Sequence, residues 1–242
     1  STEDRKDMDL MDIIADLQTN LIKTFLGEDA THDEIHYDLS ILRSAHQLYE
    51  DGKEFHNLSL YVRHNHAKRG NLRVRDPAID IDLLNMNGEY VPLLSHCNPN
   101  RPLLILAGSY TWPPFRGLVP QLNRLMDSYR DRVDMITVYI EEAHAVDEWP
   151  IGGRIRYVQP KCDADRIQIA NDFIKAIEYR ISLLIDPVSK LNPFSEVYCP
   201  WPIRFYVIDH MKKLSYIAEP IEGSFPLELI RNALDDAIQQ FQ

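Results

Sequence analysis

Three short, almost wholly apolar runs restrict the folds open to this chain more than any other feature. They are residues 102–107 (PLLILA), 133–140 (VDMITVYI) and 203–208 (IRFYVI). Runs of this length and composition are typical of strands buried on both faces, as in parallel sheets covered by helices. Between the first two runs, apolar side chains recur at helical spacing over residues 113–130. The sequence therefore predicts a strand–helix–strand unit at the centre of the fold.

Weaker signals complete this order of elements. Asn87-Gly88 between two alternating segments indicates a hairpin over residues 79–94. A strand–helix–strand unit followed by a helix, two adjacent strands and a helix is the order of a thioredoxin-like fold. The predicted class is α/β, with a thioredoxin-like central sheet flanked by helices. The later segments are a helix, a short strand, a further strand and a closing helix, at residues 163–179, 183–185, 214–218 and 227–241.

The N-terminal part of the chain has a different pattern. Apolar residues at helical spacing predict two amphipathic helices within residues 8–51, separated at Gly27. Thr31 and Glu34 have the spacing of a capping box at the start of the second helix. The apolar faces of these helices need a partner, either the main domain or a second subunit of a homodimer.

A bridge rich in histidine and basic side chains follows at residues 53–76, with a third helix as one alternative. From Ala78 onward, the pattern of residues is that of alternating strands and helices. We therefore predict an α-helical N-terminal extension, residues 1–75, and a thioredoxin-like domain, residues 76–242.

The net charge and the cysteine content limit the classes of function that we expect for this chain. Lys and Arg number 26 against 37 Asp and Glu, a net charge of −11, which argues against a nucleic-acid-binding surface. No apolar run reaches the roughly 18–20 residues of a membrane-spanning helix, and no signal-peptide pattern opens the chain. The three cysteines form neither a CxxC pair nor a disulfide framework, as expected for a reducing, cytoplasmic setting.

The chemistry of such a fold is expected at the N-terminus of the helix after the first core strand. Backbone N–H groups and the helix dipole stabilise a thiolate there, and a proline loop ahead of the third core strand faces it. Here residues 108–112 (GSYTW) lead into a helix that begins at Pro113. The proline loop is residues 199–202 (CPWP), in which Pro202 is the predicted cis-proline.

Two motifs give the chain a specific resemblance. The pattern Gly-Ser-x-Thr-x-Pro-Pro-Phe at residues 108–115 is followed by Val-Tyr-Ile-Glu-Glu-Ala-His at residues 138–144, and then by Asp147 and Trp149. Together they resemble the iodothyronine deiodinase family, over roughly residues 74–242. The first ~70 residues do not resemble the membrane anchor of those enzymes.

The chain departs from that family at its reactive positions. Deiodinases place cysteine and selenocysteine where this chain has Tyr110 and Trp112. The selenocysteine and tryptophan codons differ by one base, so Trp112 is explained as a relic of that codon. Neither side chain can form a selenenyl iodide or a mixed disulfide, and no cysteine replaces them at the helix terminus. Reductive deiodination by the family's mechanism is therefore not expected.

Polar residues after the second core strand are the candidates for catalysis. Glu141, Glu142 and His144 are expected at the same end of the sheet as Tyr110 and Trp112. The resemblance implies that the Glu and the His bind substrate and move protons. Carboxyl groups and an imidazole that lie side by side can shift each other's pKa values in opposite directions, which suits general acid–base catalysis. The predicted catalytic residues are Tyr110, Glu141, Glu142 and His144; the alternative is a loop whose charges face water.

Aromatic side chains are expected to line the same site. If Pro202 is the site proline, Trp201 approaches Tyr110 and Trp112, and aromatic walls with few polar groups suit an apolar, ring-containing ligand. The alternative is that the aromatic residues only fill the space of a lost cofactor site. The predicted substrate-binding residues are Ser109, Thr111, Trp112, Trp149, Trp201 and Pro202.

No metal site is predicted, because His32 and His36 lie one helical turn apart without a nearby cysteine or an HExxH pattern. No other cofactor is predicted either.

The leading hypothesis is a non-redox enzyme of secondary metabolism. It would perform isomerisation, cyclisation, dehydration or hydrolysis on a hydrophobic small molecule by acid–base chemistry. The alternative is a catalytically inactive, deiodinase-like protein that binds a ligand or another protein. Residual redox activity through a distant cysteine is a third, weaker alternative.

Overall fold

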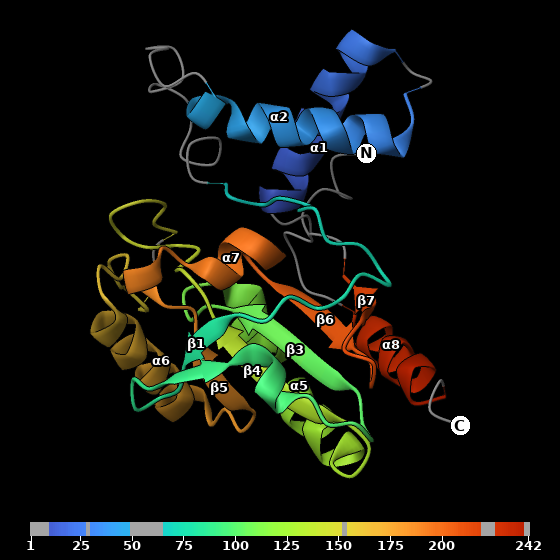
Figure 1. Ribbon diagram of the computed structural model, residues 1–242. Coiled ribbons are helices and arrows are strands. Elements are labelled where there is room, and N and C mark those ends of the chain that lie inside the picture. The colour runs from blue at the N-terminus through green and yellow to red at the C-terminus, as the bar shows by residue number, and fades with distance from the viewer. Residues whose placement is uncertain (1–9, 28–29, 49–64, 152–153, 219–225, 240–242) are drawn as a thin grey trace. The chain divides into compact units, whose positions relative to one another are not determined.

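The computed structural model describes residues 10–27, 30–48, 65–151, 154–218 and 226–239. The chain divides into two compact units, Ser1–His66 and Ala67–Gln242 (Figure 1). The segment that opens the second unit is bonded to that unit's sheet region. Arg204 Nη1 donates to the carbonyl of Arg69 at 2.9 Å, and the Arg75 N–H donates to that of Leu214 at 2.7 Å. The predicted boundary between residues 75 and 76 stays a prediction.

Two helices, α1 (Leu10–Leu26) and α2 (His32–Leu48), pack against each other in the first unit. The predicted capping box begins α2. The Thr31 N–H donates to Glu34 Oε2 at 2.8 Å, and the Glu34 N–H donates to Thr31 Oγ1 at 3.3 Å. The α-helical N-terminal extension is therefore confirmed. The third helix considered for residues 53–76 lies mostly outside the described residues, and residues 65–76 contain no helix.

A mixed sheet of seven strands, counted over the described residues, forms the centre of the second unit. The strand order is β2-β1-β5-β4-β3-β6-β7. The strands β3, β4 and β5 are parallel, β6 is antiparallel to β3, and β7 is antiparallel to β6. The strands are β1 (Asp82–Leu84), β2 (Tyr90–Pro92), β3 (Leu103–Gly108), β4 (Asp134–Tyr139), β5 (Ser182–Ile185), β6 (Arg204–Ile208) and β7 (Leu214–Ile217).

The sheet topology confirms the predicted thioredoxin-like fold. A parallel β–α–β unit is joined to an antiparallel β–β–α unit through the pairing of β3 with β6. Every residue of β3 and β6 is buried, as their apolar composition requires. The predicted hairpin is also present, with β1 antiparallel to β2. The helices of this unit are α5 (Pro113–Tyr129), α6 (Asp163–Ile177), α7 (Pro193–Tyr198) and α8 (Leu227–Gln239).

Two features of the second unit depend on close tertiary contacts. Gly108 ends β3 where a Cβ atom would lie 2.8 Å from Cγ of Phe115, so the strand can pass the helix α5 only with glycine at this position. The helix α7 was not predicted from the sequence. Asp186, which follows β5, accepts the N–H groups of Phe194 and Ser195, both at 2.9 Å, and so caps this short helix from outside it.

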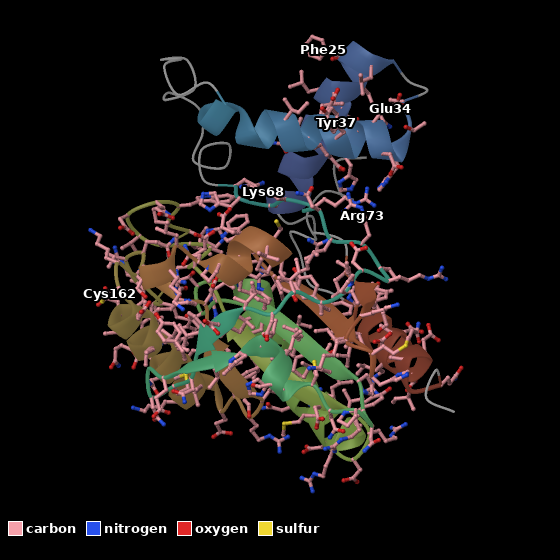
Figure 2. The ribbon with its side chains drawn as sticks, in the orientation of Figure 1. Phe25, Glu34, Tyr37, Lys68, Arg73 and Cys162 are labelled. Carbon is pink, nitrogen blue, oxygen red and sulfur yellow. The ribbon has the colours of Figure 1, made fainter. Side chains whose placement is uncertain are left out.

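Figure 2 shows the side chains of both units and labels Phe25 on α1. The Phe25 side chain is exposed. No helix in the described ranges is long and apolar enough to cross a lipid bilayer.

Candidate functional site

The parallel register of β3 and β4 brings the two sequence motifs together. Gly108 pairs with Tyr139, so the segment after β3 and the segment after β4 leave the sheet side by side at the carboxyl ends of the strands. Trp112 is the N-cap residue of α5, and Pro113 occupies the first turn of that helix. The two motifs therefore meet at the N-terminus of the helix after the first core strand, and a functional site at this position stays a prediction.

Glu142 is the buried centre of a hydrogen-bond network that joins the two segments. Its Oε2 accepts the Thr111 N–H at 2.9 Å and the Thr111 hydroxyl at 2.6 Å, while its Oε1 accepts the Tyr139 hydroxyl. Burial raises the pKa of Glu142, and these hydrogen bonds act in the opposite direction. Because all three donors point at the carboxyl group, Glu142 acts as an acceptor that positions Thr111 and Tyr139.

Two hydroxyl groups fix the backbone after β4. The Ala143 N–H donates to Ser109 Oγ at 3.2 Å, and the His144 N–H donates to Thr111 Oγ1 at 3.0 Å. Thr111 therefore bridges Glu142 and His144. The predicted substrate-binding residues Ser109 and Thr111 use their hydroxyl groups in these internal hydrogen bonds, which hold the two segments together.

His144 is held in one tautomer. Its Nδ1 lies 2.9 Å from the carbonyl oxygen of Trp149, which can only accept, so Nδ1 carries the proton and Nε2 carries the lone pair. None of the residues that the structure describes hydrogen-bonds to Nε2. Burial lowers the pKa of His144, which keeps the imidazole neutral near pH 7. This arrangement prepares Nε2 to accept a proton.

Aromatic rings extend from His144 to the proline loop. Trp112 stacks on His144 with ring centroids 5.2 Å apart, and Trp149 meets His144 edge-on at 4.9 Å. Trp149 in turn stacks on Trp201 at 6.4 Å, and the Trp201–Pro202 peptide bond is cis, as predicted. The rings of Trp112, His144, Trp149 and Trp201 thus form one continuous series beside the helix terminus.

Trp112 covers His144. Its side chain is only 2% exposed, and no described residue accepts a hydrogen bond from its buried Nε1–H. An unpaired buried donor is costly, on the order of 1–3 kcal/mol. A ligand acceptor that reached the indole N–H would remove this cost.

The structure separates Tyr110 from this series of rings. The Tyr110 ring packs against Tyr157 and Phe173, at centroid distances of 5.8 and 5.6 Å. Its carbonyl accepts Arg116 Nη1 at 2.5 Å. Trp201 reaches the site through Trp149 instead of through the expected contact with Tyr110. Glu141 is half-buried, and its charge acts on the buried guanidinium of Arg166.

Sequence reasoning missed two residues of the network. Tyr139 accepts the Tyr110 N–H at 2.9 Å with the same hydroxyl that donates to Glu142. Its place three residues before Glu142 in the second motif was the available signal. The side-chain amide of Gln159 bonds to the Glu142 backbone on both sides, at 2.8 Å to the N–H and 3.1 Å to the carbonyl. No pattern in the sequence points to Gln159.

The three cysteines are free thiols, and none of them lies in residues 108–115, where α5 begins. Cys162 is exposed and precedes α6 (Figure 2). Burial raises the pKa of Cys97 to about 11 and also raises that of Cys199, so both stay protonated thiols at neutral pH. Among the described residues, no group of three or more His, Cys, Asp or Glu side chains could hold a metal ion.

Comparisons with known proteins agree with the motifs. The sequence model of the iodothyronine deiodinase family matches residues 49–237. Thyroxine 5-deiodinase of Gallus gallus is 30% identical over 165 residues, covering 67% of this chain and 62% of that protein. Type I iodothyronine deiodinase of Xenopus laevis is 27% identical over 130 residues, covering 54% of this chain and 50% of that protein. The chain thus spans less than two thirds of these relatives' length.

Solved structures give more distant likenesses. A peroxiredoxin-like protein from Aquifex aeolicus is 13% identical with a TM-score of 0.49, covering 69% of this chain and 88% of that chain. The thioredoxin domain of a thiol-disulfide oxidoreductase from Bacteroides vulgatus is 13% identical with a TM-score of 0.47, covering 71% and 99%. At such scores these likenesses support no inference about function.

Proposed function

Because this chain belongs to the iodothyronine deiodinase family and has Tyr110 and Trp112 where a redox pair is expected, we propose that it is a non-redox enzyme of that family. The proposed reaction is proton transfer on an apolar, ring-containing small molecule, with His144 Nε2 as the general base. Isomerisation, cyclisation, dehydration and hydrolysis all contain such a step. The proposal includes a cytoplasmic location and a role in secondary metabolism.

The tautomer and the protonation state of His144 are the main support for the proposal. A general base needs a neutral imidazole whose accepting nitrogen is fixed in direction. The hydrogen bond from Nδ1 to the Trp149 carbonyl fixes the tautomer, and burial lowers the pKa of His144. Glu142 is in this proposal a positioning residue, because Thr111 and Tyr139 occupy its two oxygens.

The aromatic residues support the choice of ligand class. Trp112 and Trp149 pack against the His144 ring and Trp201 stacks on Trp149, and the Trp112 Nε1–H lacks an acceptor among the described residues. A cyclic ketone matches these features, because its carbonyl oxygen would accept the indole N–H and its ring would stack on the indoles. The weakly acidic C–H next to that carbonyl would face the imidazole.

The exchange of this C–H proton tests the proposal without knowledge of the natural substrate. We expect the protein to accelerate hydrogen–deuterium exchange next to the carbonyl of 1-tetralone in D₂O, followed by proton NMR. His144→Gln should lower this acceleration by about 10²-fold or more, the usual contribution of a general base. His96→Gln is the matched control, since burial lowers the pKa of this second histidine too, and it lies outside the site.

Two results would contradict the proposal. One is an exchange rate that is the same with wild-type protein, His144→Gln and buffer, across a panel of cyclic aryl ketones. The other is thiol-dependent release of iodide from an iodothyronine, lost when one of the three cysteines is replaced by serine.

A second candidate is a binding protein without chemistry, and the coverage of His144 by Trp112 favours it. In that case ring-containing compounds would quench the fluorescence of the three tryptophans in a saturable manner, and no exchange or product would follow. Trp112→Ala would then abolish binding, whereas His144→Gln would leave it unchanged.

A further inference from the structure

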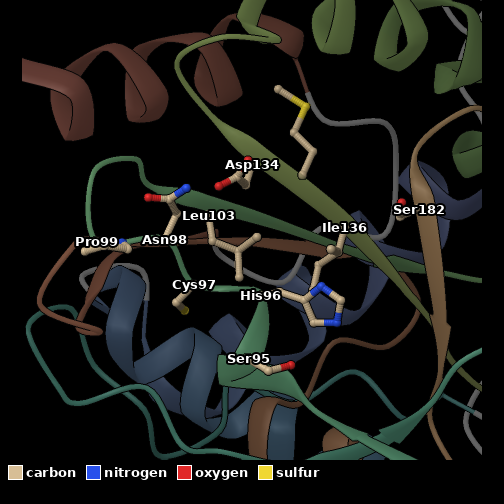
Figure 3. A pocket seen from close by; sticks show the side chains of 10 residues that line it. Ser95, His96, Cys97, Asn98, Pro99, Leu103, Asp134, Ile136 and Ser182 are labelled. Atoms are coloured by element: carbon tan, nitrogen blue, oxygen red, sulfur yellow. The ribbon is translucent and has the colours of Figure 1, made fainter. Parts of the chain in front are cut away.

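A cavity of about 450 Å³ lies next to the short helix η1 (Leu93–His96), and Figure 3 shows the side chains that line it. Leu103 and Ile136 in this lining are almost fully buried, so they offer little apolar surface to a ligand. The carboxylate of Asp134 is paired with Arg101 at 3.1 Å, which balances its charge. The cavity therefore favours no ligand of particular chemistry, and the hydrogen bonds of Gln159 support a stronger inference.

Gln159 is bonded to three residues of the loop that follows β4. Its Oε1 accepts the Glu142 N–H at 2.8 Å, and its Nε2 donates to the Glu142 carbonyl at 3.1 Å. The same Nε2 donates to Glu148 Oε2 at 2.8 Å, and the backbone N–H of Gln159 donates to Asp147 Oδ1, also at 2.8 Å. Both polar atoms of the side-chain amide are thus engaged with this loop.

The loop held by Gln159 contains the hydrogen bond that sets the tautomer of His144. The chain turns at Ala145, whose carbonyl accepts the Trp149 N–H at 3.0 Å. This turn brings the Trp149 carbonyl oxygen to 2.9 Å from His144 Nδ1. Because Gln159 is bonded to the chain on both sides of His144, it fixes the turn that carries this carbonyl.

Gln159 is itself held by its surroundings. It is half-buried, and the neighbouring Tyr157 carbonyl accepts the Val146 N–H at 2.8 Å. The Tyr157 hydroxyl donates to Asp172 of α6 at 3.0 Å, which ties this segment to the helix. Thr111 fixes the backbone N–H of His144 but does not contact the turn at residues 145–149. The position of the Trp149 carbonyl therefore depends more on Gln159 than on Thr111.

We propose that Gln159 is the positioning residue that keeps the proton of His144 on Nδ1. It holds the turn so that the Trp149 carbonyl faces Nδ1, and Nε2 keeps its lone pair as a result. Gln159 touches no ligand in this role and acts only through the loop after β4. The value of this role for catalysis rests on the function proposed for His144, but the tautomer can be measured without a substrate.

Two variants separate hydrogen bonding from packing. Gln159→Glu keeps the shape of the side chain, but its carboxylate has no N–H to donate and repels Glu148. Gln159→Met keeps a similar length and forms neither of the two kinds of hydrogen bond. In both variants we expect the share of neutral His144 with its proton on Nε2 to rise about threefold to tenfold, as when one ordinary hydrogen bond is weakened. Long-range ¹H–¹⁵N NMR of the imidazole measures this share.

Gln168→Met is the matched control. Gln168 is exposed on α6 and donates to Asp172 at 3.0 Å, so this variant should leave the tautomer of His144 unchanged. A tautomer that is also unchanged in Gln159→Glu would overturn the proposal. A change in Gln159→Met alone would overturn it too, because packing and not hydrogen bonding would then be responsible.

The exchange of 1-tetralone distinguishes this proposal from the proposed function. If the tautomer follows Gln159 but wild-type protein does not accelerate exchange, the positioning role stands and the catalytic role of His144 fails. If wild-type protein accelerates exchange and the tautomer is the same in Gln159→Glu, the positioning role fails and the catalytic role of His144 stands.

Discussion

Replacement of Thr111 by valine tests whether this residue connects the site. Valine has a shape similar to that of threonine and carries a methyl group in place of the hydroxyl. In the structure this hydroxyl donates to Glu142 Oε2 at 2.6 Å and accepts the His144 N–H at 3.0 Å. The Thr111 side chain is buried, so water cannot replace either hydrogen bond.

The two lost hydrogen bonds set the expected magnitude. A hydrogen bond to a charged carboxylate contributes about 1.5–3 kcal/mol, and a buried N–H without an acceptor costs about 1–3 kcal/mol. We expect Thr111→Val to lower the free energy of unfolding of the second unit by about 3–5 kcal/mol. Thr111→Ser keeps the hydroxyl and loses one methyl group, which costs about 1 kcal/mol.

Urea denaturation followed by tryptophan fluorescence measures both variants. All three tryptophans are buried in the second unit, so their emission reports on this unit and not on the N-terminal helices. A difference of less than about 0.5 kcal/mol between the valine and serine variants would refute the bridging role of Thr111.

Three further outcomes follow from single contacts. Because the pKa of His144 is lowered from 6.5 in the fold, its contribution to stability is complete above about pH 6.5 and is lost as the pH falls below that value. Wild type should therefore lose more stability than His144→Gln on acidification in urea titrations, and His96, which has the same sign, remains in both proteins. Gly108→Ala should destabilise by about 1–3 kcal/mol in thermal unfolding, because its Cβ would lie 2.8 Å from Phe115. Asp186→Ala should cost about 3–5 kcal/mol in the same assay, because it removes the cap of α7 and also the negative charge that faces the buried Arg166; Asp186→Asn should cost less, since the amide can still accept hydrogen bonds.

The fold could be predicted because its main elements have strong local signals. The apolar runs that became β3, β4 and β6 are too short and too apolar for anything but buried strands. The capping box at Thr31 is likewise a local pattern of side chain and backbone. In contrast, α7 has only six residues, too few for a periodic pattern, and Asn192 with Pro193 at its start is a weak signal by itself; its side-chain cap comes from Asp186, outside the helix.

The arrangement of the candidate site could be predicted only in part from the sequence. The motifs placed Thr111, Glu142 and His144 together, since parallel strands end at one edge of the sheet. The direction of each side chain depends on rotamers and neighbours that a linear motif does not contain. For this reason Tyr110 was expected beside Trp201, whereas its ring packs on Phe173. Gln159 reaches Glu142 from another loop and has no motif at all.

The protonation state of His144 tests the central claim most directly. Long-range ¹H–¹⁵N NMR of the imidazole ring, assigned with His144→Gln, reads the tautomer and the titration of this residue. The account predicts a neutral ring at pH 7 with the proton on Nδ1 and a pKa below 6.5. A proton on Nε2, or an imidazolium that persists at pH 7, would contradict His144 Nε2 as the general base.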